Sequence, residues 1–159
     1  MEKKFSHLTG AGDPTMVDVS EKAVTERVAI ARSIVALDRE IIDQLENDEI
    51  HTKKGPVFQT AILAGIMACK KTSDLIPLCH PLGLSKASVD ITIDENQEVV
   101  ILCKAKVVSK TGVEMEALTG ASVAALTIYD MCKGFSHNIV IKETRLIKKT
   151  GGKNDFQHP

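Results

Sequence analysis

The sequence contains no Trp, one Tyr and four Phe among its 159 residues. A protein that stacks the bases of single-stranded nucleic acid needs an aromatic platform, so this scarcity argues against that class. The chain also lacks an excess of charge of one sign, because 20 Lys and Arg residues stand against 21 Asp and Glu residues. Without a basic field we expect no nucleic-acid partner, whereas a single nucleotide as ligand remains compatible with this composition.

Long apolar runs and paired cysteines are absent as well. The longest stretch without a charged residue, 55–69, is shorter than the roughly 20 residues that a membrane-spanning helix needs. The N-terminus has a basic start but no apolar segment after it, so we expect no signal peptide. The four cysteines form no C-x-x-C pair, which fits a reduced protein. We therefore expect a soluble, cytoplasmic chain without a membrane partner.

The hydrophobic pattern predicts one α+β domain over residues 1–159, with flexible ends at 1–17 and 150–159. Strict alternation predicts an antiparallel hairpin, and another strand is expected near the C-terminus. Segment 24–37 is compatible with a strand buried on both faces or with a helix, and we favour the strand. The predicted strands are 24–37, 86–93, 99–108 and 138–147, and the predicted helices are 38–47, 56–71 and 113–133.

Two of these helices carry more specific expectations. Asp38 is a candidate N-cap for the first helix. The helix at 56–71 is apolar almost all round, so it should be buried, with Gly65 allowing a close approach by a neighbour. The order of strands and helices favours an antiparallel sheet with helices packed on one face, in a ferredoxin-like arrangement.

Residues 110–133 carry the strongest pattern in the chain. A Lys-Thr-Gly turn signal precedes a helix whose apolar residues form one broad core face, opposite a polar stripe that includes Glu116 and Asp130. A rise of about 1.5 Å per residue places these two carboxylates roughly 21 Å apart, so they cannot contact one reacting atom. They either bracket an elongated ligand or belong to sites completed by another subunit. Lys133 can pair with Asp130, and a solvated surface pair is the simpler interpretation.

Other candidates for chemistry lie in loops. Two prolines stiffen the loop around His80, so its imidazole is available for acid–base work, although a loop histidine more often hydrogen-bonds the backbone. Adjacent Cys79 and His80 lack the spacing of zinc ligands, and no metal site is predicted. Lys54 precedes a helix start and could favour an anion. The Lys149–Lys153 segment combines lysines with glycines that can approach phosphate, although a mobile terminus is an equal alternative.

With these residues in view, the sequence resembles the molybdenum cofactor biosynthesis protein C family, the cyclic pyranopterin monophosphate synthases. The resemblance covers nearly the whole chain and rests on long contiguous blocks. These blocks are 16–20 (M-V-D-V-S), 74–82 (D-L-I-P-L-C-H-P-L), 110–133 and the Gly-Gly-Lys of residues 151–153.

The resemblance implies a ferredoxin-like lyase that converts (8S)-3′,8-cyclo-7,8-dihydroguanosine 5′-triphosphate, a GTP-derived compound, to cyclic pyranopterin monophosphate and pyrophosphate. It also implies a homohexamer, a trimer of dimers, with active sites between protomers. It fixes no cofactor and is compatible with Mg²⁺ bound to the triphosphate. The alternatives are a non-catalytic nucleotide-binding regulatory module, which would release no pyrophosphate, and an oligomerisation domain without a ligand.

The resemblance further implies roles for individual side chains. Asp130 and Lys133 would form an acid–base pair, with the lysine driven towards its neutral form by burial or cationic neighbours. Lys54, taken in preference to Lys53 because it directly precedes Gly55, would be a second proton carrier. The other implied residues are His80 as a further catalytic group; Leu78, Cys79, His80, Met115 and Glu116, with Glu114 assisting, around the base and ribose; and Arg27, Lys149 and Lys153 around the triphosphate.

Overall fold

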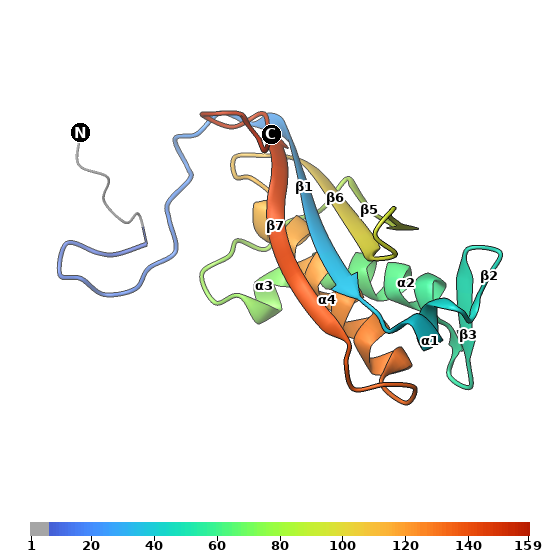
Figure 1. Ribbon diagram of the computed structural model, residues 1–159. Helices are drawn as coiled ribbons and strands as arrows, with labels where there is room; N and C mark the ends of the chain where they lie inside the picture. The colour runs from blue at the N-terminus through green and yellow to red at the C-terminus, as the bar shows by residue number, and fades with distance from the viewer. Residues whose placement is uncertain (1–6) are drawn as a thin grey trace.

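The computed structural model describes residues 7–159, and it contains a five-stranded antiparallel sheet covered on one face by two long helices (Figure 1). The strand order in this sheet is β5-β6-β1-β7-β8, and a small second sheet has the order β2-β3-β4. The elements are β1 (Thr25–Ala36), α1 (Arg39–Ile42), β2 (Leu45–Glu46), β3 (Glu49–Thr52), β4 (Gly55–Pro56), α2 (Val57–Lys70), α3 (Thr72–Leu75), β5 (Lys86–Ile93), β6 (Val99–Ser109), α4 (Glu114–Cys132), β7 (Val140–Thr150) and β8 (Phe156–Gln157).

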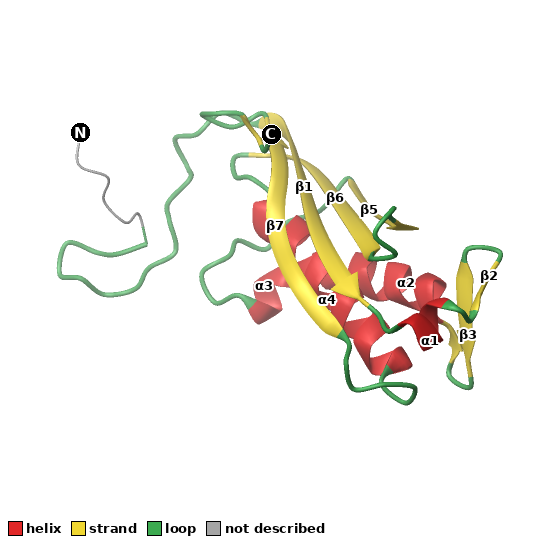
Figure 2. Cartoon of the chain, in the orientation of Figure 1, coloured by secondary structure: helices red, strands yellow, loops and turns green. Residues whose placement is uncertain are grey.

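The main elements follow a β-α-β-β-α-β order. β1 leads through α2 to the β5–β6 hairpin, and α4 then returns the chain to β7. The long β1 strand pairs with both β6 and β7, so it lies in the middle of the sheet. Both long helices pack behind the same face of the sheet, as Figure 2 shows. The α+β class is therefore confirmed, and this order is the one that a ferredoxin-like, split βαβ arrangement requires.

The face of the sheet that meets the helices is built from small and β-branched residues. In β6, every second side chain from Val99 to Val107 is buried, as the alternation in the sequence predicts. In β1, Ala29 and Ala31 are fully buried and pair with Ala105 and Cys103 of β6. This pairing confirms a strand rather than a helix at the start of the fold, but burial on both faces is wrong, because every second residue from Ile30 onward is only partly buried. The facing side of α4 is equally small, and its fully buried residues include Ala117, Ala121, Ala124 and Ala125.

The two long helices approach each other closely at a pair of glycines. A Cβ added to Gly65 of α2 would lie 2.9 Å from the carbonyl oxygen of Gly120 in α4. A Cβ added to Gly120 would lie 2.5 Å from the sulfur atoms of Cys69 and Cys103. Neither distance leaves room for a side chain, since packed carbon atoms need about 3.5–4.0 Å. The close approach predicted at Gly65 is confirmed.

The expectation that α2 is buried on all sides is wrong. Leu63 is 60% exposed and Met67 is 53% exposed. Together with the partly exposed Ile62 and Ile66 they form an apolar surface, which we call the α2 face. Within residues 7–159, no helix is both long and apolar enough to cross a membrane. The apolar pattern of α2 therefore reflects two different surfaces, one packed on the sheet and α4, the other left uncovered by the chain.

The helix predicted at 38–47 is also largely wrong, because α1 ends at Ile42. Asn47 and Asp48 both adopt positive φ values, of 51° and 60°, between β2 and β3. Two such residues form the tight turn that a two-residue hairpin requires, and Asn and Asp tolerate it well. The preference of Asn47 and Asp48 for a hairpin turn is stronger than the helical spacing of the apolar residues before them, so the helix ends early. Asp38 does occupy the N-cap position, but its carboxylate accepts hydrogen bonds from Ser136 and Asn138 instead of capping the helix.

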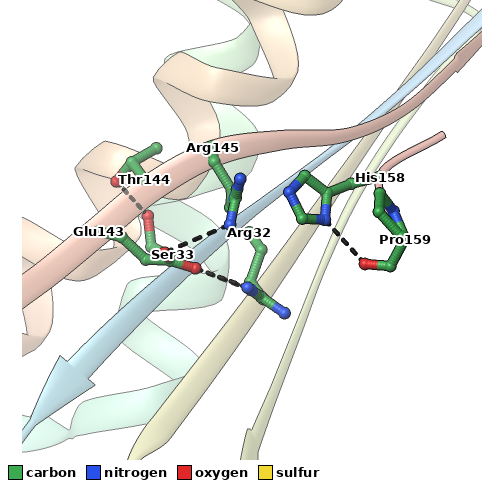
Figure 3. A network of polar contacts seen from close by, with 7 residues as sticks. All are labelled: Arg32, Ser33, Glu143, Thr144, Arg145, His158 and Pro159. Atoms are coloured by element: carbon green, nitrogen blue, oxygen red, sulfur yellow. Dashed lines mark hydrogen bonds and ion pairs between the residues drawn. The ribbon is translucent and has the colours of Figure 1, made fainter. Parts of the chain in front are cut away.

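The last predicted strand starts and ends later than expected. β7 runs from Val140 to Thr150, so Lys149 belongs to a strand rather than to a loose tail, and β8 pairs with its end. Polar contacts tie β7 to β1 (Figure 3). The buried Ser33 hydroxyl shares a hydrogen bond with Thr144, and Arg32 forms an ion pair of 2.6 Å with Glu143. These contacts hold the strand that later supplies Lys149 to the site.

Replacing Gly65 by Ala should lower the free energy of unfolding by about 1–2 kcal/mol, because the added methyl group forces α2 away from α4. The gain in helix propensity, about 1 kcal/mol, is too small to offset the collision with a backbone oxygen. Urea unfolding followed by circular dichroism measures the change. Gly134→Ala is the matched control, since a Cβ there would meet nothing within 4 Å. Wild-type stability of the Gly65 variant would mean that the helices are not held this close.

Candidate active site

Helix α4 positions both halves of the predicted site. The turn before Glu114 starts the helix, and its small-residue face is buried against the sheet, so the axis of the helix is held in place. Glu114 lies in the first turn and Asp130 in the last. Positions 114 and 130 are roughly 24 Å apart at about 1.5 Å per residue. Each end of α4 therefore carries a separate group of functional side chains.

At the C-terminal end of α4, Asp130 binds two lysines at once. Its Oδ1 lies 2.8 Å from Nζ of Lys133, one turn further on, and its Oδ2 lies 2.9 Å from Nζ of Lys54. Lys54 comes from the β3–β4 turn, where its backbone N–H donates to the hydroxyl of Thr52. We call Lys54, Asp130 and Lys133 the lysine–aspartate cluster. The cluster lines an open groove of about 460 Å³ that also includes Lys53 and Phe135.

The charges in this cluster stabilise one another. Hydrogen bonds from Lys133 and then from Lys54 lower the pKa of Asp130 to about 2. The same contact with Asp130 raises the pKa of Lys133 above its ordinary value. The expected shift of this lysine towards its neutral form is therefore wrong for the single chain, because the side chain is half exposed and its nearest neighbour is an anion. A plain surface pair is also an incomplete description, since Lys54 joins it from a distant segment.

At the N-terminal end of α4 lies a pocket of about 490 Å³, which we call the base pocket. It combines the loop after α3 with the first turn of α4. All six residues assigned to base and ribose contacts line it: Leu78, Cys79, His80, Glu114, Met115 and Glu116. Residues from sequence segments more than 30 positions apart thus line one cavity.

Three titratable groups in the base pocket have restricted surroundings. Nε2 of His80 lies 2.8 Å from the carbonyl oxygen of Val17, so the backbone contact foreseen as the simpler interpretation is present and orients the ring. Glu116 is only 4% exposed, and this burial raises the pKa of its carboxyl group. Burial and the nearby Glu116 carboxylate also raise the pKa of the Cys79 thiol, which disfavours a reactive thiolate.

Next to the base pocket lies a pocket of about 260 Å³ that contains the residues assigned to the triphosphate, and we call it the basic pocket because Lys and Arg side chains line it. Arg27, Lys149 and Lys153 line it together with Gly152. Arg27 is oriented by the backbone, because its Nη2 donates to the carbonyl oxygen of Lys110 at 3.2 Å. Gly151 adopts a φ of +83°, and a Cβ there would collide with a backbone carbonyl of β1. The glycine is therefore needed to bring the loop against the strand.

The base pocket and the basic pocket adjoin each other. Lys22, Thr111, Gly112 and Glu114 line both. The sequence patterns missed Lys22, because a single lysine in a polar loop carries no local signal. Thr111 and Gly112 were noted only as part of a turn, and Val17 only as part of a contiguous block. Their position around the cavity depends on the tertiary structure.

The single chain does not bring all predicted site residues together. Lys54, Asp130 and Lys133 lie at one end of α4, whereas His80, Arg27, Lys149 and Lys153 lie around the other. None of the residues from 7 to 159 forms a group of three or more His, Cys, Asp or Glu side chains arranged to hold a metal ion. The single chain thus offers a pocket with apolar and acidic side chains, an adjoining basic pocket, and the lysine–aspartate cluster at the far end of α4.

Comparison with known proteins gives consistent matches. The MoaC family matches residues 16–152. The chain is 51% identical over 155 residues to the cyclic pyranopterin monophosphate synthase of Clostridium perfringens, covering 97% of each. It is 50% identical over 153 residues to the enzyme of that name from Xanthomonas oryzae pv. oryzae, covering 96% of this chain and 93% of that protein. Against the molybdenum cofactor biosynthesis bifunctional protein of Synechocystis sp., identity is 54% over 155 residues, and the match spans 45% of that longer protein.

The family match includes the blocks at 16–20, 74–82 and 110–133 in full and the two glycines of the last block, and it extends over both ends of α4. The resemblance noted in the sequence is therefore confirmed. The chain belongs to the MoaC family.

Proposed function

We propose that this chain converts (8S)-3′,8-cyclo-7,8-dihydroguanosine 5′-triphosphate to cyclic pyranopterin monophosphate, with release of pyrophosphate, in molybdenum cofactor biosynthesis. One observation carries the proposal: a base pocket adjoins a basic pocket, in a chain 50–51% identical to synthases of this activity by name. A cyclised nucleoside triphosphate has the matching shape, with a flat heterocycle and ribose at one end and three phosphates at the other. In this proposal the enzyme is a lyase, and pyrophosphate is one of its two products.

The base pocket suits a nucleobase-derived ring. Leu78 and Met115 supply apolar surface, and the buried carboxyl of Glu116 offers an acceptor for ring N–H groups. A buried carboxylate without a bound ligand carries a desolvation cost, which N–H donors of a substrate would offset. We therefore assign Glu116 to recognition of the ring, with Cys79 and His80 beside it.

The basic pocket suits the triphosphate. Arg27, Lys149 and Lys153 supply positive charge, and hydrogen bonds from charged donors to phosphate oxygens are among the stronger polar contacts. When a hydroxyl of the substrate attacks the α-phosphate, it loses its proton to water, one O–P bond forms and the bond to the pyrophosphate oxygen breaks. The negative charge then increases on the departing pyrophosphate, where these three side chains stabilise it.

The lysine–aspartate cluster supplies the proton transfers. Because the pKa of Asp130 is held at about 2 and that of Lys133 is raised, the cluster starts with a carboxylate between two ammonium groups. Lys133 or Lys54 can donate a proton to a ring nitrogen as the purine-derived ring opens, and the same lysine, now neutral, can accept a proton as the pterin ring closes. Asp130 keeps both amines in position and compensates their charge.

A second copy of the chain must complete the site, since roughly 24 Å separates the two ends of α4. We propose a homo-oligomer, a hexamer of three dimers, in which the cluster of one protomer faces the base pocket of its neighbour. The α2 face supports this proposal, because Leu63 and Met67 are exposed apolar side chains that a partner copy would bury. Phe135, half exposed in the cluster groove, is a further candidate for such a contact.

We also place the enzyme in the cytoplasm. All four cysteines are free thiols, and the sulfur atoms of Cys69 and Cys103 lie 3.5 Å apart. Three of the four, Cys69, Cys103 and Cys132, are buried, and small apolar cysteines packed in a core are typical of proteins from a reducing compartment.

Replacing Lys54 by Ala should lower the rate of pyrophosphate release by about 10²- to 10⁴-fold, the usual contribution of general acid–base groups. The assay supplies the cyclised GTP intermediate and measures pyrophosphate. Lys53→Ala is the matched control, because Lys53 lines the same groove but does not contact Asp130. A wild-type chain that binds the intermediate without releasing pyrophosphate would instead support a non-catalytic binding module.

Replacing Lys133 by Met should raise the pKa of Asp130 from about 2 towards the ordinary value, since the hydrogen bond from Lys133 is the largest cause of the shift. In the wild type, the lowered pKa of Asp130 keeps its carboxylate ionised and its ion pairs intact until the pH falls through about 2. Between pH 5 and 3 the variant should therefore begin to protonate Asp130 while the wild type does not. A ¹³C NMR titration of the carboxyl group measures this, and Lys142→Met, which removes a partner of Glu98, is the control.

Shared sites predict complementation between two inactive variants. Lys54→Ala damages the cluster and Arg27→Ala damages the basic pocket, so neither homo-oligomer should turn over. Co-expression should restore about a quarter of the wild-type sites, because mixed dimers are about half of the population and each contains one intact site. Two variants that damage the same end, Lys54→Ala and Asp130→Ala, are the control and should not complement. Absence of recovery in both mixtures would place each complete site within one protomer.

A further inference from the structure

Lys149, one of the proposed phosphate ligands, is already engaged by a carboxylate. Its Nζ lies 2.9 Å from Oε1 of Glu114, and the contact joins β7 to the first turn of α4. The Glu114 side chain folds back over Gly112, where an added Cβ would collide with the carboxylate. Both side chains are about one-third exposed, with relative accessibilities of 36% and 29%, so ligands can reach the pair.

Within the described residues, Glu114 is the one acidic side chain that lines the basic pocket. The charged residues that line this pocket within the described chain are Lys22, Arg27, Lys149, Lys153 and Glu114. A carboxylate and a phosphate oxygen bind an ammonium group in the same way, through short charge-assisted hydrogen bonds. Both anions cannot share Lys149 without repelling each other, since like charges in close contact cost several kcal/mol in an interface. A phosphate that enters the pocket must therefore compete with Glu114.

A second position is available to the Glu114 side chain. It lines the base pocket as well as the basic pocket, and it is the only acidic side chain that lines both within residues 7–159. If the Glu114 side chain rotates away from Lys149, its carboxylate moves into the base pocket, which the residue already lines. The base pocket then holds two carboxylates, Glu114 and Glu116, next to the substrate ring.

We propose that Glu114 is an internal substitute for a phosphate group, which holds Lys149 while the basic pocket is empty and regains it as pyrophosphate leaves. This inference rests on the proposed function, because it takes pyrophosphate as the departing ligand. Glu114 acts here as a positioning residue. Its competition weakens the binding of free pyrophosphate and so favours product release, while Lys149 is kept in place for the next substrate.

The test is calorimetric titration of inorganic pyrophosphate into the full-length chain and its variants. Glu114→Gln keeps the size of the side chain and removes its charge, and it should tighten pyrophosphate binding on the order of tenfold, the equivalent of about 1.4 kcal/mol. In a Lys149→Met background the same substitution should change the affinity by less than about twofold, because the contested ammonium group is gone. Glu26→Gln removes a carboxylate that pairs with Lys106 outside both pockets, and it controls for a general change of charge.

Turnover of the cyclised GTP intermediate provides a separate readout. Product inhibition by pyrophosphate should become stronger in Glu114→Gln by the same factor as the change in binding. If Glu26→Gln tightens binding equally, or if Glu114→Gln tightens it equally without Lys149, the substitution acts through general charge and the inference is overturned. An unchanged affinity in Glu114→Gln would overturn it too. A wild-type chain without turnover would overturn the proposed function instead, whatever the pyrophosphate affinities.

Discussion

The packing of α4 on the sheet is the constraint on which the rest of the structure depends. Alanines on the buried face of the helix meet alanine and cysteine side chains of β1 and β6, and Gly120 brings the helix against α2. Small side chains allow the backbones to approach closely, and such contacts leave little freedom for the helix to slide or rotate. Because the axis is held in this way, Glu114 and Asp130 are placed at fixed opposite ends. The distance between the two halves of the site follows directly from the length of the helix.

The two ends differ in their electrostatics. At the C-terminal end, Asp130 is exposed and compensated by two lysines, so all three groups are charged and the pKa of the carboxyl is low. At the N-terminal end, Glu116 is buried and its pKa is raised by desolvation. One helix thus presents a carboxylate that holds cations and a carboxyl group that suits hydrogen-bond donors of a ligand. In the proposed oligomer these two environments meet around a single substrate, and closure by the second protomer would also lower the solvent exposure of the cluster.

Most of the long elements could be predicted from the sequence, because their hydrophobic period is unambiguous. The β5–β6 hairpin alternates strictly, and α4 has a clear apolar face between a turn signal and Gly134. The predictions failed where another local or tertiary effect was stronger. The Asn47–Asp48 turn ended α1 early, and the apolar period of α2 did not distinguish a surface packed within the chain from the α2 face. The expected shift of Lys133 towards its neutral form failed because the pattern showed that Asp130 is within reach but not that the lysine is half exposed in the single chain, where Asp130 raises its pKa.

By itself the sequence determined the family of this protein, its α+β class and the residue types of the site, since these follow from contiguous motifs and from hydrophobic period. Only the tertiary structure decided which of those residues lie together. It joined Lys54 of the β3–β4 turn to Asp130 at the end of α4, enclosed Glu116, and brought Lys149 against Glu114. The physical reason is that charge pairing and desolvation depend on distances between segments far apart in the chain. Those distances are set by how closely the helices pack on the sheet.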